Sequence, residues 1–203
     1  MAITIWLVRH GLKEKEIGDV GLTLEGIQQA KSAAQALSSR PITLILSSPL
    51  RRAKETAEYL AQALQLNVHE DRRLRERANW GDLPGQTFEE FVEVWERCTR
   101  DSDHQPPGGG DSARQAALRL HEAVRDYAPR CRPGEELVFF THGGVMTDYL
   151  VCTLEEAELN KTHPNFMALQ SSLVPECSIT ELIVQTDGRC RLGRFADVRH
   201  LEA

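Results

Sequence analysis

Three short apolar runs in the sequence each end in residues that could bind or transfer an anionic group. The first run is followed by Arg9 and His10, the second by two serines, and the third by Thr141 and His142. Glycine follows each histidine, and glycine lets backbone N–H groups approach a ligand closely. Arg9 and Arg52 carry planar guanidinium groups that match the oxygens of phosphate or carboxylate. The residue types therefore indicate a site for an oxyanion.

Two other interpretations of these histidines are a structural role and metal binding. A single histidine at a strand end is more often structural, and histidine also binds zinc well. Arg51 and Arg52 lie at a predicted helix start, where the partly positive backbone repels their charges. They belong either to a solvated face or to a site where a bound anion relieves this repulsion. An arginine directly precedes His10, with no cysteine or HExxH partner nearby. We therefore favour anion binding and predict neither a metal nor a cofactor.

Strands that alternate with helices are expected to bring these residues together. Apolar and β-branched runs predict strands at residues 3–8, 43–46 and 137–140, and a hairpin of residues 179–184 and 190–195. Apolar residues at helical spacing predict helices after the N-cap Thr23, from Ser48-Pro49, from about Ser112 to Tyr127, and over residues 145–154. This alternation implies crossover connections and a largely parallel sheet. Ligands of such sheets gather at the carboxyl ends of the strands, where both histidine motifs lie.

Length and composition predict an ordinary globular protein. The chain has 203 residues, which favours one domain over residues 1–203, and 24 Lys and Arg against 30 Asp and Glu give a net charge of −6. The acidic balance argues against a nucleic-acid partner, and no apolar run approaches the roughly 20 residues of a membrane span. The first ten residues do not resemble a signal peptide, and the five cysteines lack CxxC spacing. We expect a cytoplasmic protein with reduced thiols; its oligomeric state stays open.

Residues 78–110 have a different character from the rest of the chain. A short helical stretch is bounded there by segments rich in proline and glycine, and we interpret the whole as an insertion that covers one end of the sheet. Trp80, Phe88, Phe91 and Trp95 could line a substrate pocket or could pack the insertion onto the sheet. Their helical spacing favours packing onto the sheet.

The motifs, taken in order, resemble the histidine phosphatase superfamily, in its phosphoglycerate-mutase-like branch. The matching segments are LVRHG (7–11), LTLEGIQQA (22–30), SPLRRAKETA (48–57), LRE (74–76), THGGV (141–145) and CSITEL (177–182). One RHG triplet would be a weak signal, whereas an ordered series that spans nearly the whole chain is specific. The resemblance implies a three-layer α/β/α sandwich with a mainly parallel sheet.

The resemblance also implies roles for the residues of the predicted anion site. His10 would be the nucleophile that accepts the phosphoryl group as a phosphohistidine, which water then hydrolyses. Arg9, Arg52, His142 and Gly143 would bind the phosphoryl oxygens, with His142 protonated when the anion is bound. The physical logic agrees, because covalent catalysis divides one difficult transfer into two and positive charge stabilises the transferring group.

Glu76 is the candidate general acid, which would protonate the departing alkoxide and later take a proton from water. The surrounding run RRLRER at 72–77 could instead be a salt-bridged surface turn. Spacing alone favours the surface turn, and the match to the family motif favours the acid.

The sequence departs from the family pattern after the RHG triplet. An acidic residue, a serine or threonine, and an asparagine usually follow, whereas here Lys13 and Lys15 lie in that stretch. Either lysine could replace the asparagine as a phosphate donor, although a solvated position is favoured. Residues 78–110 hold seven acidic side chains and two arginines, a poor cover for the bisphosphorylated intermediate of a mutase.

We therefore expect a metal-independent phosphomonoesterase that acts on small phosphorylated metabolites through His10. A phosphoprotein phosphatase is the second reading and a phosphoglycerate mutase the third. A non-catalytic phosphate-binding module is the alternative outside the enzymes.

Overall fold

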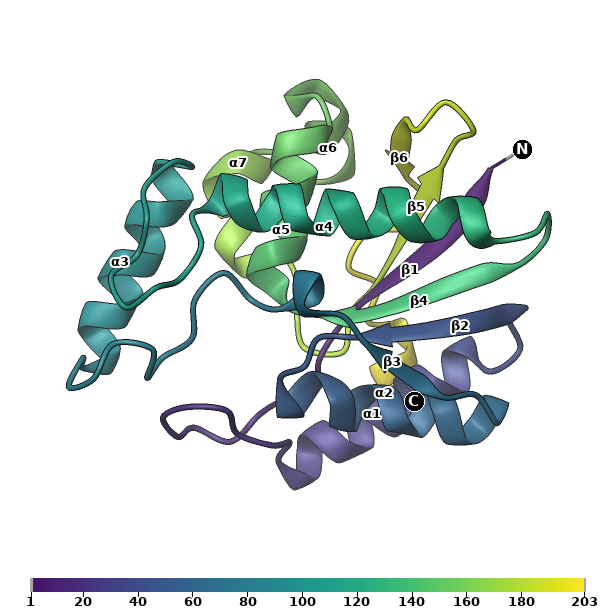
Figure 1. Ribbon diagram of the computed structural model, residues 1–203, viewed down its shortest axis with the longest axis horizontal. Coiled ribbons are helices and arrows are strands. Elements are labelled where there is room, and N and C mark those ends of the chain that lie inside the picture. The colour runs from purple at the N-terminus through teal and green to yellow at the C-terminus, as the bar shows by residue number, and fades with distance from the viewer. Residues whose placement is uncertain (1, 203) are drawn as a thin grey trace.

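The computed structural model describes residues 2–202, built around a six-stranded sheet with the order β3-β2-β4-β1-β5-β6 (Figure 1). The strands are β1 (Ile3–Arg9), β2 (Ile42–Ser47), β3 (Val68–Glu70), β4 (Glu136–Thr141), β5 (Ile179–Val184) and β6 (Cys190–Leu192). Strands β3, β2, β4 and β1 are parallel, whereas β5 runs antiparallel to β1 and β6 antiparallel to β5. The predicted largely parallel sheet and its closing hairpin are confirmed.

Helices cover both faces of the sheet. They are α1 (Leu24–Leu37), α2 (Arg51–Leu64), α3 (Phe88–Arg100), α4 (Ala113–Tyr127), α5 (Gly143–Thr153), α6 (Glu156–Thr162) and α7 (Phe166–Leu169). In Figure 1, α1 and α2 lie below the sheet, and α4 to α7 lie above it. This is the three-layer α/β/α arrangement that the sequence predicts. No helix within residues 2–202 is both long and apolar enough to cross a membrane.

The central strands are buried on both sides, so their side chains contribute to two separate hydrophobic cores, one on each face of the sheet. Leu7 and its partner across the ladder, Phe139, belong to the core beneath α4 and α5. Val8 and its partner Phe140 belong to the core beneath α1 and α2. Each such side chain contributes roughly 1.5–3 kcal/mol when it is fully buried. The ends of β1 and β4 are therefore held firmly where the polar motifs begin.

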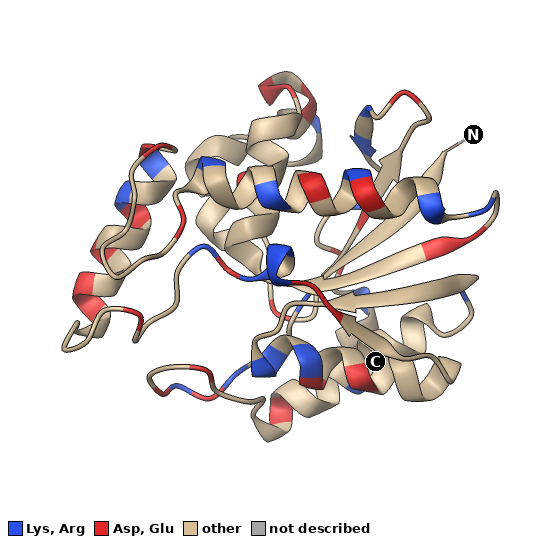
Figure 2. Cartoon of the chain, in the orientation of Figure 1, with Lys and Arg blue, Asp and Glu red and all other residues tan. Residues whose placement is uncertain are grey.

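Charge follows the same layering. Figure 2 shows Lys, Arg, Asp and Glu mainly on helices and connecting loops, and few on the strands inside the sheet. This pattern is typical of a parallel sheet that is covered on both faces.

Two details of the fold differ from the prediction. Helix α2 begins at Arg51 after the N-cap Leu50, so Pro49 precedes the helix and does not occupy its first turn. The Ser48 hydroxyl accepts a hydrogen bond from the Leu50 N–H at 3.3 Å and also reaches into the candidate site. Strand β3 was not predicted because three half-exposed edge residues show no periodicity.

Residues 78–110 extend from the sheet at the carboxyl ends of the parallel strands (Figure 1). Thr87 and Glu90 form a reciprocal capping box at the start of α3, which fixes where that helix begins. Only Cys98 is buried in α3. The apolar residues of this helix therefore do not pack onto the sheet, in contrast to the prediction.

Candidate active site

The polar motifs meet at one edge of the sheet because β1, β2 and β4 are adjacent and parallel. Arg9 is paired in register with Thr141, and the His10 N–H donates to the Thr141 carbonyl at 3.0 Å. The Ser48 N–H donates to the carbonyl of Phe140 at 2.9 Å. The topology thus places the three motifs together as the sequence predicts.

The ring of His10 is held in one orientation and one tautomer. Its Nδ1 lies 2.7 Å from the Gly11 carbonyl oxygen, and a carbonyl only accepts, so Nδ1 carries the hydrogen. Nε2 then holds the lone pair of the neutral ring, 3.2 Å from Nε of Arg52. Burial, followed by the positive charges of Arg52 and Arg9, lowers the pKa of His10 well below its ordinary value. His10 is therefore a neutral imidazole with a directed lone pair.

His142 lies beside His10, with ring centroids 5.0 Å apart. Its Nε2 is 2.8 Å from the hydroxyl oxygen of Ser48, a residue that the sequence pattern placed at the end of a strand and the start of a helix but not beside His142. Burial first, and then the charge of Arg52, lowers the pKa of His142 well below its ordinary value. Burial and the neighbouring cations thus favour a neutral ring, and an added negative charge would favour its protonation.

Each of the two predicted arginines is fixed by neighbours at two nitrogens. Arg9 donates to the Val174 carbonyl and to the Glu176 carboxylate, both at 2.5 Å. Arg52 donates from Nε to His10 and from Nη2 to the Asn79 side-chain oxygen at 3.2 Å. Glu176 and Asn79 are site residues that sequence reasoning missed, since neither lies in a motif that was singled out.

Three buried nitrogens of this cluster lack a hydrogen-bond partner within residues 2–202. They are Nε of Arg9, Nη1 of Arg52 and Nδ1 of His142. An unsatisfied buried polar group costs about 1–3 kcal/mol, so such groups are rarely left without a purpose. A tetrahedral oxyanion offers acceptors to several donors at once. A metal ion is disfavoured here, because the Arg52 guanidinium already faces the free nitrogen of His10.

The carboxylate of Glu76 is held at the N-terminus of α5. It accepts hydrogen bonds from the backbone N–H groups of Gly144 at 3.0 Å, Val145 at 2.9 Å and Arg77 at 2.9 Å. Glu76 lines the same pocket as His10, so it is not part of a surface turn. The neighbouring Arg77 instead pairs with the buried Asp148 at 2.7 Å.

Arg119 of α4 fixes the backbone that carries Glu76. Its guanidinium donates to the carbonyls of Arg73 and Arg75 at 2.7 Å and of Glu76 at 3.1 Å. Asp111 accepts from its Nε at 2.7 Å. No motif in the sequence pointed to Arg119, because the three carbonyls that it binds lie more than forty residues earlier in the chain.

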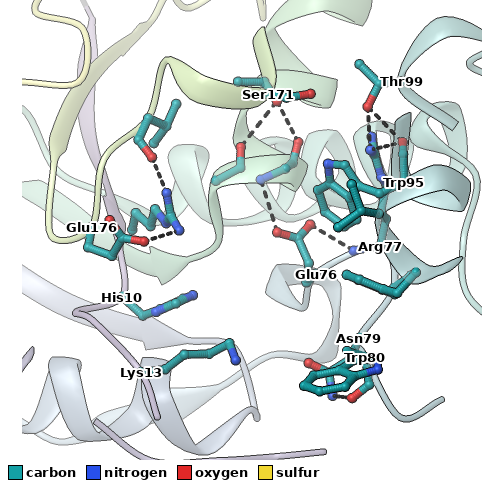
Figure 3. A pocket seen from close by; sticks show the side chains of 18 of the residues that line it. His10, Lys13, Glu76, Arg77, Asn79, Trp80, Trp95, Thr99, Ser171 and Glu176 are labelled. Carbon is teal, nitrogen blue, oxygen red and sulfur yellow. Dashed lines mark hydrogen bonds and ion pairs between the residues drawn. The ribbon is translucent and has the colours of Figure 1, made fainter. Parts of the chain in front are cut away.

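The cluster opens into a pocket of about 320 Å³ (Figure 3). Arg9, His10, Arg52, Glu76 and Gly143 line it, as does Lys13, whereas Lys15 does not. Burial, and then the charges of Arg52 and Arg9, lower the pKa of Lys13. His142 is 1% exposed and lies behind this wall.

The opposite wall comes from residues 78–110. Trp80, Phe88, Phe91 and Trp95 all line the pocket. Packing onto the sheet was the favoured expectation for these side chains, and it was wrong. The reason is that α3 stands beyond the strand ends, where its apolar residues face the pocket and not the sheet (Figure 1).

This geometry agrees with the result of a comparison with protein families. A model described as histidine phosphatase superfamily (branch 1) matches residues 5–197. The chain belongs to this superfamily. The resemblance that the motifs indicated is thereby confirmed over nearly the whole sequence.

Relatives of this chain include proteins named as phosphatases and proteins named as phosphoglycerate mutases. A glucosyl-3-phosphoglycerate phosphatase of Mycolicibacterium vanbaalenii is 32% identical over 209 residues, which cover 95% of this chain and 89% of the relative. Phosphoglycerate mutase-like protein 4 of Arabidopsis thaliana is 35% identical over 156 residues, covering 70% and 67%. The mycobacterial glucosyl-3-phosphoglycerate phosphatase solved with inorganic phosphate is 28% identical with a TM-score of 0.73, covering 98% of this chain and 99% of that one.

Proposed function

We propose that this protein hydrolyses phosphomonoesters of small metabolites through a covalent phosphohistidine on His10. The observation that carries the proposal is the unprotonated Nε2 of His10, which accepts a hydrogen bond from Arg52, in a cluster where Arg9, Arg52 and His142 each hold a buried nitrogen without a hydrogen-bond partner within residues 2–202. A nucleophile and a set of hydrogen-bond donors for the phosphoryl oxygens are the two requirements of this chemistry.

In the first half-reaction, Nε2 of His10 attacks phosphorus. The N–P bond forms as the P–O bond to the alcohol breaks, and Glu76, entering in its protonated form, gives its proton to the departing oxygen. Arg9 and Arg52 stabilise the charge on the phosphoryl oxygens, and the added anion favours a protonated His142. Loss of one donor of this kind costs about 10²–10³ in rate.

In the second half-reaction, the Glu76 carboxylate takes a proton from water. The water oxygen attacks phosphorus, the N–P bond breaks, and its electron pair returns to Nε2 of His10. Inorganic phosphate leaves, and both residues regain the state in which they began. Every atom that this cycle requires comes from the chain, the substrate and water.

The composition of the pocket wall favours hydrolysis over mutase activity. Among the described residues, the part of the wall that comes from 78–110 contains no lysine or arginine. The acidic side chains of residues 78–110 do not line the pocket either. The sequence suggested that an excess of acids disfavours mutase activity, whereas in the structure it is the lack of positive charge on this wall that disfavours it. A bisphosphorylated intermediate would lack cations for its second phosphate there.

The enclosure of the pocket favours a small molecule over a phosphoprotein. Residues 78–110 supply the wall opposite His10, and the volume of about 320 Å³ suits a metabolite. The relative that aligns with 95% of the chain is a phosphatase whose name specifies a small phosphorylated substrate. A loop of a folded protein would need a shallower site.

Hydrolysis of p-nitrophenyl phosphate tests the proposal. We expect turnover that a chelator leaves unchanged and that His10→Ala abolishes while circular dichroism shows an intact fold. Arg52→Ala should lose about 10²–10³ in rate, whereas the matched control Arg51→Ala, whose exposed side chain pairs with Glu55, should keep it. Substantial turnover by His10→Ala would overturn the nucleophile assignment.

Two further assays separate the alternatives. Isomerisation of phosphoglycerate that is primed by bisphosphoglycerate would favour the mutase. Faster turnover of phosphopeptides than of any small phosphate would favour the phosphoprotein phosphatase. Phosphate binding without hydrolysis of any phosphomonoester would leave a non-catalytic module.

A further inference from the structure

The wall opposite His10 points to the chemistry of the alcohol half of the substrate. We propose that the preferred substrates are phosphate monoesters whose alcohol carries a flat aromatic or similarly apolar group next to the reacting oxygen, and no second anionic group. This inference rests on the proposed phosphatase function and adds the substrate class.

The first step of the argument is the apolar surface itself. Trp80 and Phe88 contact edge to face with ring centroids 5.3 Å apart, and Phe91 and Trp95 lie at 5.9 Å. All four rings line the pocket, and none is fully buried. Covering apolar surface gains about 25 cal/mol per Å², so a flat apolar group that enters the pocket is stabilised.

The second step is where this surface begins. A Cβ added to Gly144 would lie 2.5 Å from Trp95 ring atoms and 2.7 Å from Oε1 of Glu76, so the ring and the carboxylate approach the same glycine. In Figure 3, Trp95 lies close to Glu76. The leaving oxygen must reach Glu76 to receive its proton. The carbon bonded to that oxygen, and the group that this carbon carries, therefore come close to Trp95.

The third step is that the Trp95 ring is held in place. The guanidinium of Arg77 lies 3.8 Å from its ring centroid, a cation–π distance. Arg77 is itself fixed by Asp148 at 2.7 Å, the Trp95 carbonyl at 2.9 Å and the Thr99 hydroxyl at 2.6 Å. A preformed wall of this kind loses little freedom when a ligand binds.

The fourth step is the distribution of charge. Both Nη atoms of Arg9 are bound by chain groups. The Arg77 guanidinium lines the pocket, but it lies against the Trp95 ring, both of its Nη atoms donate to chain groups, and the Asp148 carboxylate pairs with its charge. Figure 3 shows Lys13 next to His10 and away from Trp95. Glu176 adds a carboxylate to the lining. A second anionic group near Trp95 would meet the Arg77 guanidinium, whose charge is already paired with Asp148, so it would gain less there than an apolar group gains from the rings.

Three alkyl phosphates with similar leaving groups test this inference on the wild-type protein. They are 2-phenylethyl phosphate, n-propyl phosphate and 3-(phosphonooxy)propanoate. All three share two carbons next to the phosphate oxygen, and these end in a phenyl ring, a methyl group or a carboxylate, respectively. We expect kcat/KM to be about tenfold higher for the phenyl ester than for the propyl ester, and lowest for the carboxylate. Equal values for the three, or the highest value for the carboxylate, would overturn the inference.

Variants of the wall locate the preference. The ratio of kcat/KM for the phenyl and propyl esters should fall severalfold in Trp80→Ala and in Phe91→Ala. It should be unchanged in Leu118→Ala, an exposed apolar residue of α4 that lies outside this pocket. An unchanged ratio in both wall variants would contradict the assigned subsite.

Failure of the inference is distinguishable from failure of the proposed function. If p-nitrophenyl phosphate and all three alkyl esters resist hydrolysis, the phosphatase proposal falls and the substrate class falls with it. If all are hydrolysed without the expected order, only the substrate class falls.

Discussion

Nε of Arg52 lies 3.2 Å from Nε2 of His10, on the opposite side of the ring from the hydrogen bond to Gly11. The guanidinium disfavours a proton at that nitrogen, and the carbonyl keeps the other nitrogen protonated. These two contacts therefore leave Nε2 unprotonated, with its lone pair accepting a hydrogen bond from Arg52, and place a cation next to the position of an incoming phosphoryl group.

The first prediction concerns the protonation of His10. Its pKa should lie well below the ordinary value of 6.5, because burial and the charge of Arg52 both disfavour imidazolium. Removing that charge in Arg52→Met should raise the pKa, whereas the exposed Arg51→Met should not change it. NMR titration of the imidazole protons measures both, and a wild-type pKa at or above 6.5 would contradict this account.

The same shift has a consequence for the pH dependence of activity. Protonated His10 has no lone pair, so kcat/KM should fall only as the pH drops through its lowered pKa, well below 6.5. The profile must be corrected for ionisation of the substrate phosphate. A loss of activity that begins above pH 6.5 and that remains after this correction would argue against His10 as the nucleophile.

Glu76→Gln tests the general acid. The amide can still occupy the site but cannot give a proton to the leaving oxygen. We expect a loss of about 10²–10⁴ in rate for alkyl phosphates and a much smaller loss for aryl phosphates, whose leaving groups need no proton. Equal losses for both classes would remove Glu76 from this role.

Arg119 should act as a positioning residue for Glu76, since it binds the carbonyls of Arg73, Arg75 and Glu76 without lining the pocket. In Arg119→Met, kcat for alkyl phosphates should fall about 10-fold to 10²-fold while aryl phosphates change less. Arg114→Met is the matched control, because that exposed arginine of α4 pairs only with groups remote from the site. A uniform loss with both substrate classes would indicate a merely structural role.

Asp148 predicts a pH-dependent stability. Burial raises its pKa to about 7 although Arg77 pairs with it. Between the unfolded value of 3.8 and about 7 the folded state holds a proton that the unfolded state has lost, so the contribution of this residue to the free energy of unfolding falls as pH rises. Asp148→Asn removes that decline. We therefore compare the free energy of unfolding of the variant with that of wild type by denaturant unfolding. The difference should favour the variant more at about pH 8 than at about pH 5. The reverse order would contradict the raised pKa.

Local sequence patterns were sufficient to predict the elements that carry the motifs. The apolar runs before His10 and His142 are buried central strands, and these need no distant information to be recognised. Their meeting at one sheet edge followed from the rule for parallel strands. The choice of Arg52 over Arg51 came from the resemblance to the family motif, and in the structure Arg52 lies beside His10 while the Arg51 side chain is exposed.

Features that depend on tertiary placement could not be predicted in this way. Phe88, Phe91 and Trp95 have the spacing of a core-facing helix, and only the position of α3 beyond the strands shows that they face a pocket. Arg119 and Glu176 have no local signal, because their partners lie far away in the chain. Hydrophobic periodicity indicates that a face is covered, but it does not indicate what covers it.

Identification of the phosphorylated residue tests the central claim most directly. The enzyme is mixed with a phosphomonoester, quenched in alkali within the turnover time, digested, and analysed by mass spectrometry for peptides that contain His10 and His142. A phosphoryl group on the His10 peptide alone, absent from His10→Ala, is the predicted result. Steady turnover with no phosphoenzyme at any quench time, or with the phosphoryl group on His142, would contradict the account.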